Sequence, residues 1–189
     1  MDKKRVFGYK VKKVGDLVQM DTIVRFEHGV KRYIFSAIDV KSRFAFAYAY
    51  KTKSSKSASD FIHKLDKVSP FNIKAVQTDN GSEFMGTSDS TLKDLSIVHL
   101  FSYPRSPKQN AYVERFNRTL QEDIVEEYRE LLETDLDTFN NKLIDYLLFY
   151  NTKRPHHSLK NKVPLRIVSD RINQLSSNLQ ESNMYWTDT

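Results

Sequence analysis

The sequence contains no cysteine, which excludes a disulfide framework and any zinc site built on cysteine ligands. It has no run of 18 apolar residues, so we expect no membrane-spanning segment. The basic N-terminus is not followed by the apolar segment that a signal peptide requires. Internal repeats and low-complexity blocks are also lacking. These absences favour a globular protein that works in a reducing compartment.

The residues that are present are those of a folded, basic domain. Hydrophobic residues make up 39% of the chain and aromatic residues 12%, which is enough for a core and argues against disorder. The net charge of +6 suits a polyanionic partner, although many ordinary domains carry a similar charge. We expect a basic arm over residues 1–13, a core over 14–168 with a helical extension, and a flexible polar tail over 169–189. The arm is either solvated or in contact with phosphates.

Hydrophobic periodicity and turn residues predict an α/β fold with a mixed five-stranded sheet. Strands are expected at 17–26, 33–40, 44–50, 73–78 and 98–101. The first three are joined by tight turns and are therefore antiparallel, whereas the later ones follow crossovers. Helices are expected at 54–68 and 88–95, then from Pro107 through Tyr128, and from 134 to 150. Ser88 and Ser106 are the expected caps of two of these helices.

Three acidic residues stand at the positions that matter most for function. Asp21 lies inside an apolar strand, where burying a carboxylate is costly unless it is paired or binds a cation. Asp79 ends a strand, and Glu114 lies 34 intervening residues later, on the flank of a helical apolar stripe. Each acid alone has an ordinary explanation, since Asp79 can simply stabilise a turn and Glu114 can be an exposed helix residue.

If the three carboxylates meet in space, they form a site for Mg²⁺, because magnesium prefers hard oxygen ligands. Two such ions would activate a hydroxyl and stabilise the leaving oxygen in phosphodiester chemistry. We expect Asp21 to bridge the two ions. From spacing alone, this hypothesis and the ordinary explanations stay open.

Other polar residues have two possible roles each. Asp39 either stabilises a strand-end turn or adds a fourth acid to the metal site. We interpret Glu83 as loop structure or DNA positioning, not as a metal ligand. The neighbouring His156 and His157 lack a spaced partner, so packing or phosphate contact is favoured over zinc. Side chains around Glu114 are candidate DNA contacts: Lys108, Asn110, Arg115 and Arg118.

The chain resembles the catalytic core of insertion-sequence transposases and retroviral integrases, the Asp-Asp-Glu members of the ribonuclease-H-like superfamily. The motifs that carry the resemblance lie between about residues 14 and 168. They are Met20-Asp21-Thr22, Ser36-Ala37-Ile38-Asp39 with Ser42-Arg43, Thr78-Asp79-Asn80-Gly81-Ser82-Glu83-Phe84, Ser106-Pro107, the segment from Asn110 to Leu120, and Tyr150-Asn151 with Arg154-Pro155-His156-His157-Ser158-Leu159.

The resemblance implies a ribonuclease-H-like fold and a metal-dependent enzyme that cleaves DNA strands and transfers them to a target. It assigns the binding of two Mg²⁺ ions, with Mn²⁺ as a substitute, to Asp21, Asp79 and Glu114. It implies element ends and target DNA as partners, a homodimer or higher oligomer, and a cytoplasmic, nucleoid-associated location in a bacterium.

Two departures from the family pattern leave alternatives open. The spacing from Asp79 to Glu114 is one residue shorter than is usual in the family. Full transposases also carry an N-terminal DNA-binding region, whereas only about 13 residues precede the core here. We therefore expect a fragment or a separately encoded partner. A catalytically silent DNA-binding or multimerising fragment is the main alternative, and a simple ribonuclease-H-type nuclease is another.

Overall fold

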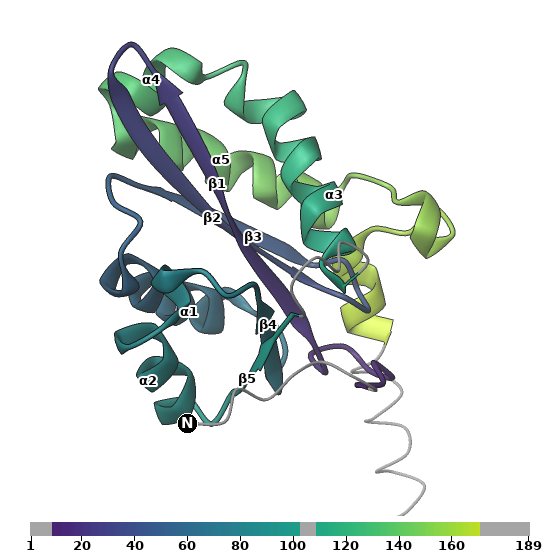
Figure 1. Ribbon diagram of the computed structural model, residues 1–189. Helices are drawn as coiled ribbons and strands as arrows, with labels where there is room; N and C mark the ends of the chain where they lie inside the picture. Colours follow the sequence, from purple (N-terminus) through teal and green to yellow (C-terminus); the bar gives the residue numbers. More distant parts are fainter. Residues whose placement is uncertain (1–8, 103–108, 171–189) are drawn as a thin grey trace, which may run out of the picture.

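The computed structural model describes residues 9–102 and 109–170. Its centre is a five-stranded sheet in the order β3-β2-β1-β4-β5 (Figure 1). The strands are β1 (Val18–Glu27), β2 (Val30–Asp39), β3 (Ala45–Tyr50), β4 (Ala75–Thr78) and β5 (Val98–Phe101). The pairs β1–β2 and β2–β3 are antiparallel, whereas β1–β4 and β4–β5 are parallel. The predicted mixed sheet is therefore confirmed.

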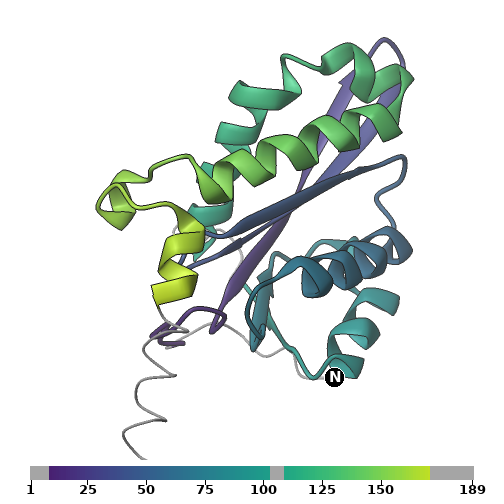
Figure 2. The ribbon, with the colours of Figure 1, turned by 180° about the vertical axis from the view of Figure 1, so that it is seen from behind.

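Helices cover both faces of this sheet. The helices are α1 (Ser55–Val68), α2 (Thr87–Asp94), α3 (Ala111–Leu120), α4 (Arg129–Thr134) and α5 (Leu136–Thr152). α1 and α2 lie on one face, and α3, α4 and α5 lie on the other, as both views show (Figures 1 and 2). No helix within the described ranges is both long and apolar enough to cross a membrane.

Aromatic side chains fill the space between the sheet and its helices. On the α1 face, Phe46 stacks on Phe61 with the ring centroids 5.5 Å apart, and Phe35 lies edge-on to Phe84 at 6.1 Å. All four rings are buried. Ring pairs of this kind add about 0.5–1.5 kcal/mol beyond the apolar area they bury. The sheet is thus held rigidly, which matters because its strands carry the candidate site.

Two of the predicted helix starts differ from the structure. The α-helix α3 is described from Ala111, and the predicted cap Ser106 and first residue Pro107 lie outside the described residues. The expected long helix ends at Leu120, where a π-helical segment, Gln121–Val125, begins. Ser88 was wrongly predicted as a cap, because α2 begins one residue earlier. Ser88 is instead buried, and its hydroxyl donates to the backbone oxygen of Glu83 at 2.8 Å.

The described end of the basic arm is attached to the core through Asp16. The carboxylate of Asp16 accepts hydrogen bonds from the backbone N–H groups of Lys12, at 2.9 Å, and Lys13, at 2.7 Å. It also pairs with the ammonium of Lys74 at 2.8 Å. Residues 1–8 and 171–189 lie outside the described ranges, so the proposed boundaries of arm and tail stay predictions.

Two asparagines of α5 close the free edge of the sheet. Asn140 accepts from the backbone N–H of Ala49 at 2.8 Å and donates to its carbonyl oxygen at 3.1 Å. Asn151 makes the same pair of bonds with Ala45, at 2.9 and 2.8 Å. The helix can come this close because β3 alternates alanines with aromatic residues, as the sequence predicted. The unpaired groups of an edge strand are thereby satisfied within the chain.

Replacing Asn140 or Asn151 with alanine is expected to lower the free energy of unfolding by about 1–3 kcal/mol each, because a buried backbone donor and acceptor lose their partners. Denaturant unfolding followed by circular dichroism measures this loss. Asn141→Ala is the matched control, since Asn141 is exposed on the same helix. Equal stability of the control and the two buried-site variants would show that these bonds do not hold the edge.

Candidate active site

Asp21 lies in the middle of β1, and its carboxylate is held from two sides. The backbone N–H of Thr22 donates to Oδ1 at 2.8 Å, and the amide of Asn117 on α3 donates to Oδ2 at 2.8 Å. The carbonyl oxygen of Asn117 in turn accepts from the hydroxyl of Ser36 on β2 at 2.6 Å. Three elements therefore fix the direction of Asp21. The sequence placed Asn117 on the correct flank of the helix but did not identify this role.

The start of α3 is fixed by β1 and not by a cap of its own. The side-chain oxygen of Gln19 accepts from the backbone N–H groups of Tyr112 and Val113, both at 3.2 Å. These groups are among the donors that the first turn of a helix leaves without partners. Because Glu114 follows directly in α3, the same contacts set the position of its backbone. The side chains of Glu114, Arg115 and Arg118 are exposed.

Asn110, a predicted DNA contact, takes part in a polar network just before α3. Its side-chain oxygen accepts from the amide of Gln77 and from the hydroxyl of Ser102, both at 2.9 Å. Gln77 is buried in β4, so this network joins the strand that leads to Asp79 with the helix that carries Glu114. Lys108, the other predicted contact next to Asn110, lies outside the described residues.

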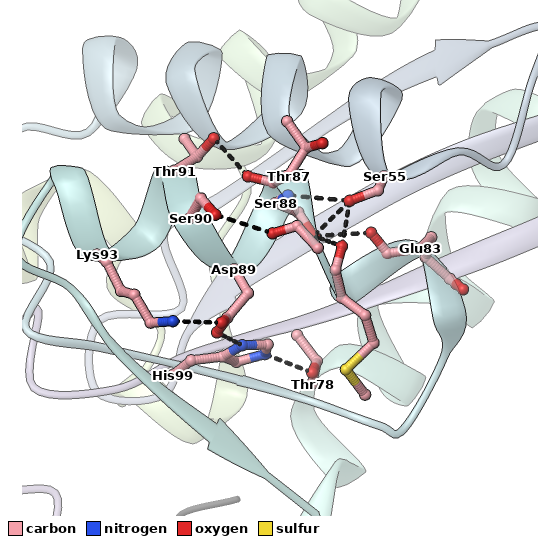
Figure 3. Close-up of polar contacts among 12 residues, drawn as sticks. Ser55, Thr78, Glu83, Thr87, Ser88, Asp89, Ser90, Thr91, Lys93 and His99 are labelled. Atoms are coloured by element: carbon pink, nitrogen blue, oxygen red, sulfur yellow. Dashed lines mark hydrogen bonds and ion pairs between the residues drawn. The ribbon is translucent and has the colours of Figure 1, made fainter. Parts of the chain in front are cut away.

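Asp79 follows the last residue of β4, and its side chain is exposed. Its Oδ1 accepts from the backbone N–H of Gly81 at 2.8 Å, so it does stabilise the turn. The strand end itself is held by a chain of polar side chains (Figure 3). Thr78 Oγ1 is hydrogen-bonded to His99 at 2.9 Å, and the other ring nitrogen of His99 is 3.0 Å from Asp89. This support anchors the backbone that presents Asp79.

The three acids influence one another electrostatically. Burial raises the pKa of Asp21, and the negative charges of Asp79, Glu114 and Glu83 raise it further, although the Thr22 N–H group opposes the change. The structure therefore brings the predicted acids into one neighbourhood. Their ligand atoms are not all within 4.8 Å of one another. Repulsion between like charges accounts for this spread.

One other cluster in the described part of the chain does meet that distance. Ligand atoms of Glu27, His28 and Glu133 all lie within 4.8 Å of one another, at the tip of the β1–β2 hairpin. The side chain of His28 is 78% exposed, and Glu27 pairs with Arg129 at 3.2 Å. These ordinary surface ion pairs explain the cluster, and we assign it no function.

Glu83 is the residue whose position the sequence did not reveal. Its side chain is only 2% exposed. Its Oε1 accepts from the ammonium of Lys53 at 2.9 Å and from the hydroxyl of Thr22 at 3.1 Å. Its Oε2 is buried without any hydrogen-bond partner. The hydroxyl of Ser88 holds the Glu83 backbone in place (Figure 3).

Asp39 serves the turn between β2 and β3. It is fully buried, and its carboxylate accepts from the backbone N–H of Gly15 at 2.9 Å and of Ser42 at 2.6 Å. The hydroxyl of Ser42 adds a third bond at 2.7 Å. With both oxygens satisfied, Asp39 acts as a structural residue, which is the role that the sequence favoured over metal binding.

The raised pKa of Asp21 predicts how the stability of the metal-free protein depends on pH. The folded protein keeps the proton of Asp21 to a higher pH than the unfolded chain, whose Asp21 titrates near its ordinary pKa of 3.8. The stability contributed by Asp21 therefore falls as pH rises from 3.8 towards the raised pKa. We expect wild type to lose stability relative to Asp21→Asn across this window, measured by urea unfolding in EDTA. A difference that is constant with pH would contradict the burial of this charge.

Comparisons with known proteins agree with this architecture. A model of the integrase core domain matches residues 11–107, and a second integrase core domain model matches residues 95–164. The ORF3 protein of Spiroplasma virus SpV1-C74, assigned as an integrase, is 33% identical over 88% of this chain. An uncharacterised 39.2 kDa protein of insertion element IS476 from Xanthomonas euvesicatoria is 30% identical over 56% of the chain. The chain spans 51% and 30% of these two relatives.

Solved structures share the fold. A chain of the simian T-cell lymphotropic virus intasome matches with a TM-score of 0.68 and 19% identity, over 88% of this chain and 56% of its own length. The catalytic core domain of BIV integrase matches with a TM-score of 0.66 and 22% identity, over 86% of this chain and 99% of its own length. The ribonuclease-H-like fold is thereby established. Because an integrase core model covers more than half of the sequence, the chain belongs to the integrase core domain family.

Proposed function

We propose that this chain is the catalytic core of a polynucleotidyl transferase that cleaves DNA strands and joins their 3′ ends to a target. Asp21, Asp79 and Glu114 are its proposed catalytic and cation-binding residues. The observation that carries the proposal is the buried Asp21, whose pKa is raised by burial and by the charges of three further acids. Concentrating negative charge in this way destabilises the metal-free protein, and a bound cation would offset that cost.

The residues fit Mg²⁺, with Mn²⁺ as a substitute. All the candidate donors are carboxylate oxygens, the hard ligands that these ions prefer, and Glu83 offers a further oxygen that no described group satisfies. Two ions bound there would lower the pKa of an attacking hydroxyl and stabilise the leaving oxygen. We assign the bridging position to Asp21, because Asn117 and Thr22 direct both of its oxygens.

The protein's own part in the reaction is to hold these acids in place. Asp21 and Asp79 come from neighbouring strands, β1 and β4, and Glu114 comes from a helix whose start is bonded to β1. Sites built on such elements keep their geometry better than sites on loops. Water would otherwise have to reorganise around the charges that develop during phosphoryl transfer, so a fixed arrangement lowers the barrier.

Two adjoining hollows beside α3 suit a nucleic-acid backbone. Their volumes are about 580 and 480 Å³, and they share Arg43, Tyr112 and Ser158. Cationic side chains line them: Lys41, Arg43, Arg115, Arg154, Lys160 and Lys162. No aspartate or glutamate is among the described lining residues. Arg154 and Lys162 pair with acids outside the lining, at 3.8 and 3.0 Å. The surplus of positive charge favours contact with phosphates.

The Arg-Pro-His-His motif forms one wall of these hollows. Its loop is closed by a backbone bond from His156 to Lys162 at 3.1 Å, and Lys160 and Asn161 both have positive φ, 55° and 61°. Residues other than glycine rarely adopt this conformation, and such strain gathers at functional sites. The ring of His156 packs edge-on against Tyr150 at 4.7 Å, which confirms the predicted packing role.

Replacing Arg115 and Lys160 together with glutamate is expected to weaken DNA binding on the order of 10-fold and to flatten its salt dependence by about 0.9 per lost phosphate contact. Fluorescence anisotropy with a labelled duplex, repeated at several salt concentrations, measures both effects. The control replaces Lys67 and Lys142, exposed lysines that line neither hollow. Equal weakening in the control would indicate a net-charge effect and would remove the hollows from the proposed DNA path.

The chemistry is tested with a branched DNA substrate carrying a labelled strand. We expect Mg²⁺ or Mn²⁺ to support joining or its reversal and EDTA to abolish it. Binding without any joining under either ion would instead favour the catalytically silent fragment. Simple hydrolysis without joining would favour a nuclease.

We further propose that the chain works as a homodimer or higher oligomer on two DNA ends. The exposed apolar residues Ile144, Leu148 and Phe149 on α5 support an interface, since they are 45%, 63% and 46% exposed. Sedimentation equilibrium would reveal the assembly. A monomer at all concentrations, with and without DNA, would contradict it.

A further inference from the structure

Glu83 is a buried acid that the proposed function has not used for a defined role. It lies four residues after Asp79, at the end of the same turn. A buried carboxylate normally satisfies both oxygens, because leaving a charged group without hydrogen bonds costs stability. Here Oε1 has two partners, Lys53 and Thr22, whereas Oε2 has none among the described residues. Packing alone does not explain this asymmetry.

The unpaired oxygen faces the candidate cation site. A Cβ placed on Gly81 would lie 2.6 Å from Oε2 of Glu83 and 2.8 Å from Oδ1 of Asp79. The two carboxylates therefore border the same small space, which exists because residue 81 has no side chain. The partner of Oε1 leads to the same place, since Thr22 follows Asp21 on β1. Glu83 thus connects both of the aspartates that are proposed to bind cations.

Lys53 brings the only positive side chain that the described contacts place on this group of acids. Its ammonium is 2.9 Å from Glu83, and its side chain is 36% exposed, so it can move away without unfolding anything. In the metal-free protein it neutralises part of the acidic charge. A divalent cation entering the space beside Gly81 meets repulsion from this ammonium and attraction from Glu83.

We propose that Glu83 is a fourth carboxylate of the cation site and that Lys53 is its built-in competitor. Glu83 strengthens the binding of a divalent cation, and Lys53 weakens it by occupying the same acids when the cation is absent. This inference rests on the proposed function, because it assumes that Asp21 and Asp79 bind the cation. It makes an unusual prediction: the two members of one ion pair affect cation affinity in opposite directions.

The test measures Mn²⁺ affinity directly, by electron paramagnetic resonance of the free ion, in the full chain without DNA. Glu83→Gln is expected to weaken binding by about 10- to 100-fold, the range found when groups supporting a metal site are removed. Lys53→Met is expected to strengthen it by a factor on the order of 10. The matched control removes the exposed ion pair of α1 with Asp60→Asn and Lys64→Met, which alters the same charges elsewhere.

Thermal unfolding without metal guards against a folding defect. If Glu83→Gln also lowers the melting temperature, Lys53→Met decides, because a loosened structure cannot bind the cation more tightly. Unchanged affinity in both variants, or weaker binding in both, overturns the inference and leaves Glu83 and Lys53 as a structural pair. Wild type that binds no Mn²⁺, or that binds it equally well after Asp21→Asn, overturns the proposed function itself.

Discussion

Glu114→Gln is expected to reduce the rate of DNA strand joining by about 1,000-fold, while the protein stays folded. The substitution keeps the size of the side chain and removes only its charge. Cations bound by carboxylates supply several kcal/mol of transition-state stabilisation, and about 4 kcal/mol corresponds to this factor. Because Glu114 is exposed on α3, its loss leaves no cavity or unpaired buried group. Asp21→Asn and Asp79→Asn are expected to cause losses of the same order.

Single-turnover joining with labelled DNA gives the rate, and the melting temperature reports the fold. Glu122→Gln is the control, since Glu122 is an exposed acid shortly after α3 and lies outside the proposed site. Wild-type rates for the control and a loss for Glu114→Gln would separate a catalytic role from a general charge effect. If the Glu114 variant joined DNA as fast as wild type, Glu114 would have to leave the proposed site.

Gly81→Ala is expected to lower the joining rate by about 100-fold, which is the loss that a misplacement of roughly 1 Å can cause. Gly81 has a φ of −59°, so alanine fits the backbone without strain. The added methyl group, however, would come within 2.6 Å of Glu83 Oε2 and 2.8 Å of Asp79 Oδ1. The protein can accommodate it only by moving these carboxylates, so the cation site is disturbed and the core is not.

Joining assays and Mn²⁺ titration measure the effect of Gly81→Ala, with circular dichroism as a check on folding. Ser82→Ala is a fair comparison, because Ser82 is the exposed next residue of the same turn. Normal cation affinity and a normal rate in Gly81→Ala would mean that the space beside residue 81 has no part in the reaction.

Much of the fold could be predicted from local patterns. The alternation of aromatic residues with alanines in β3 identified both the strand and the face that a helix approaches, because side chains in a strand point alternately to opposite faces. The hairpin after β1 was predicted from Gly29, whose φ of 79° suits glycine. Asp21 stood out because a carboxylate inside an apolar strand needs an explanation.

The remaining features depend on contacts between distant parts of the chain. Gln19 caps α3 from a strand 93 residues earlier, so no local signal shows it. Asn117 reaches Asp21 across 96 residues. The burial of Glu83 follows from the packing of its loop against α1, where Ser55 donates to the backbone oxygen of Met85. Ser88 has the chemistry of a cap but is used inside this loop, which is why propensity alone misplaced it.

The most direct test is anomalous diffraction from crystals of this chain soaked in Mn²⁺. We predict a peak bounded by the carboxylates of Asp21 and Asp79, with Glu114 beside it, and its absence in Asp21→Asn. A peak only at the hairpin tip, beside Glu27, His28 and Glu133, or no peak near Asp21, would contradict a shared cation centre formed by these three acids.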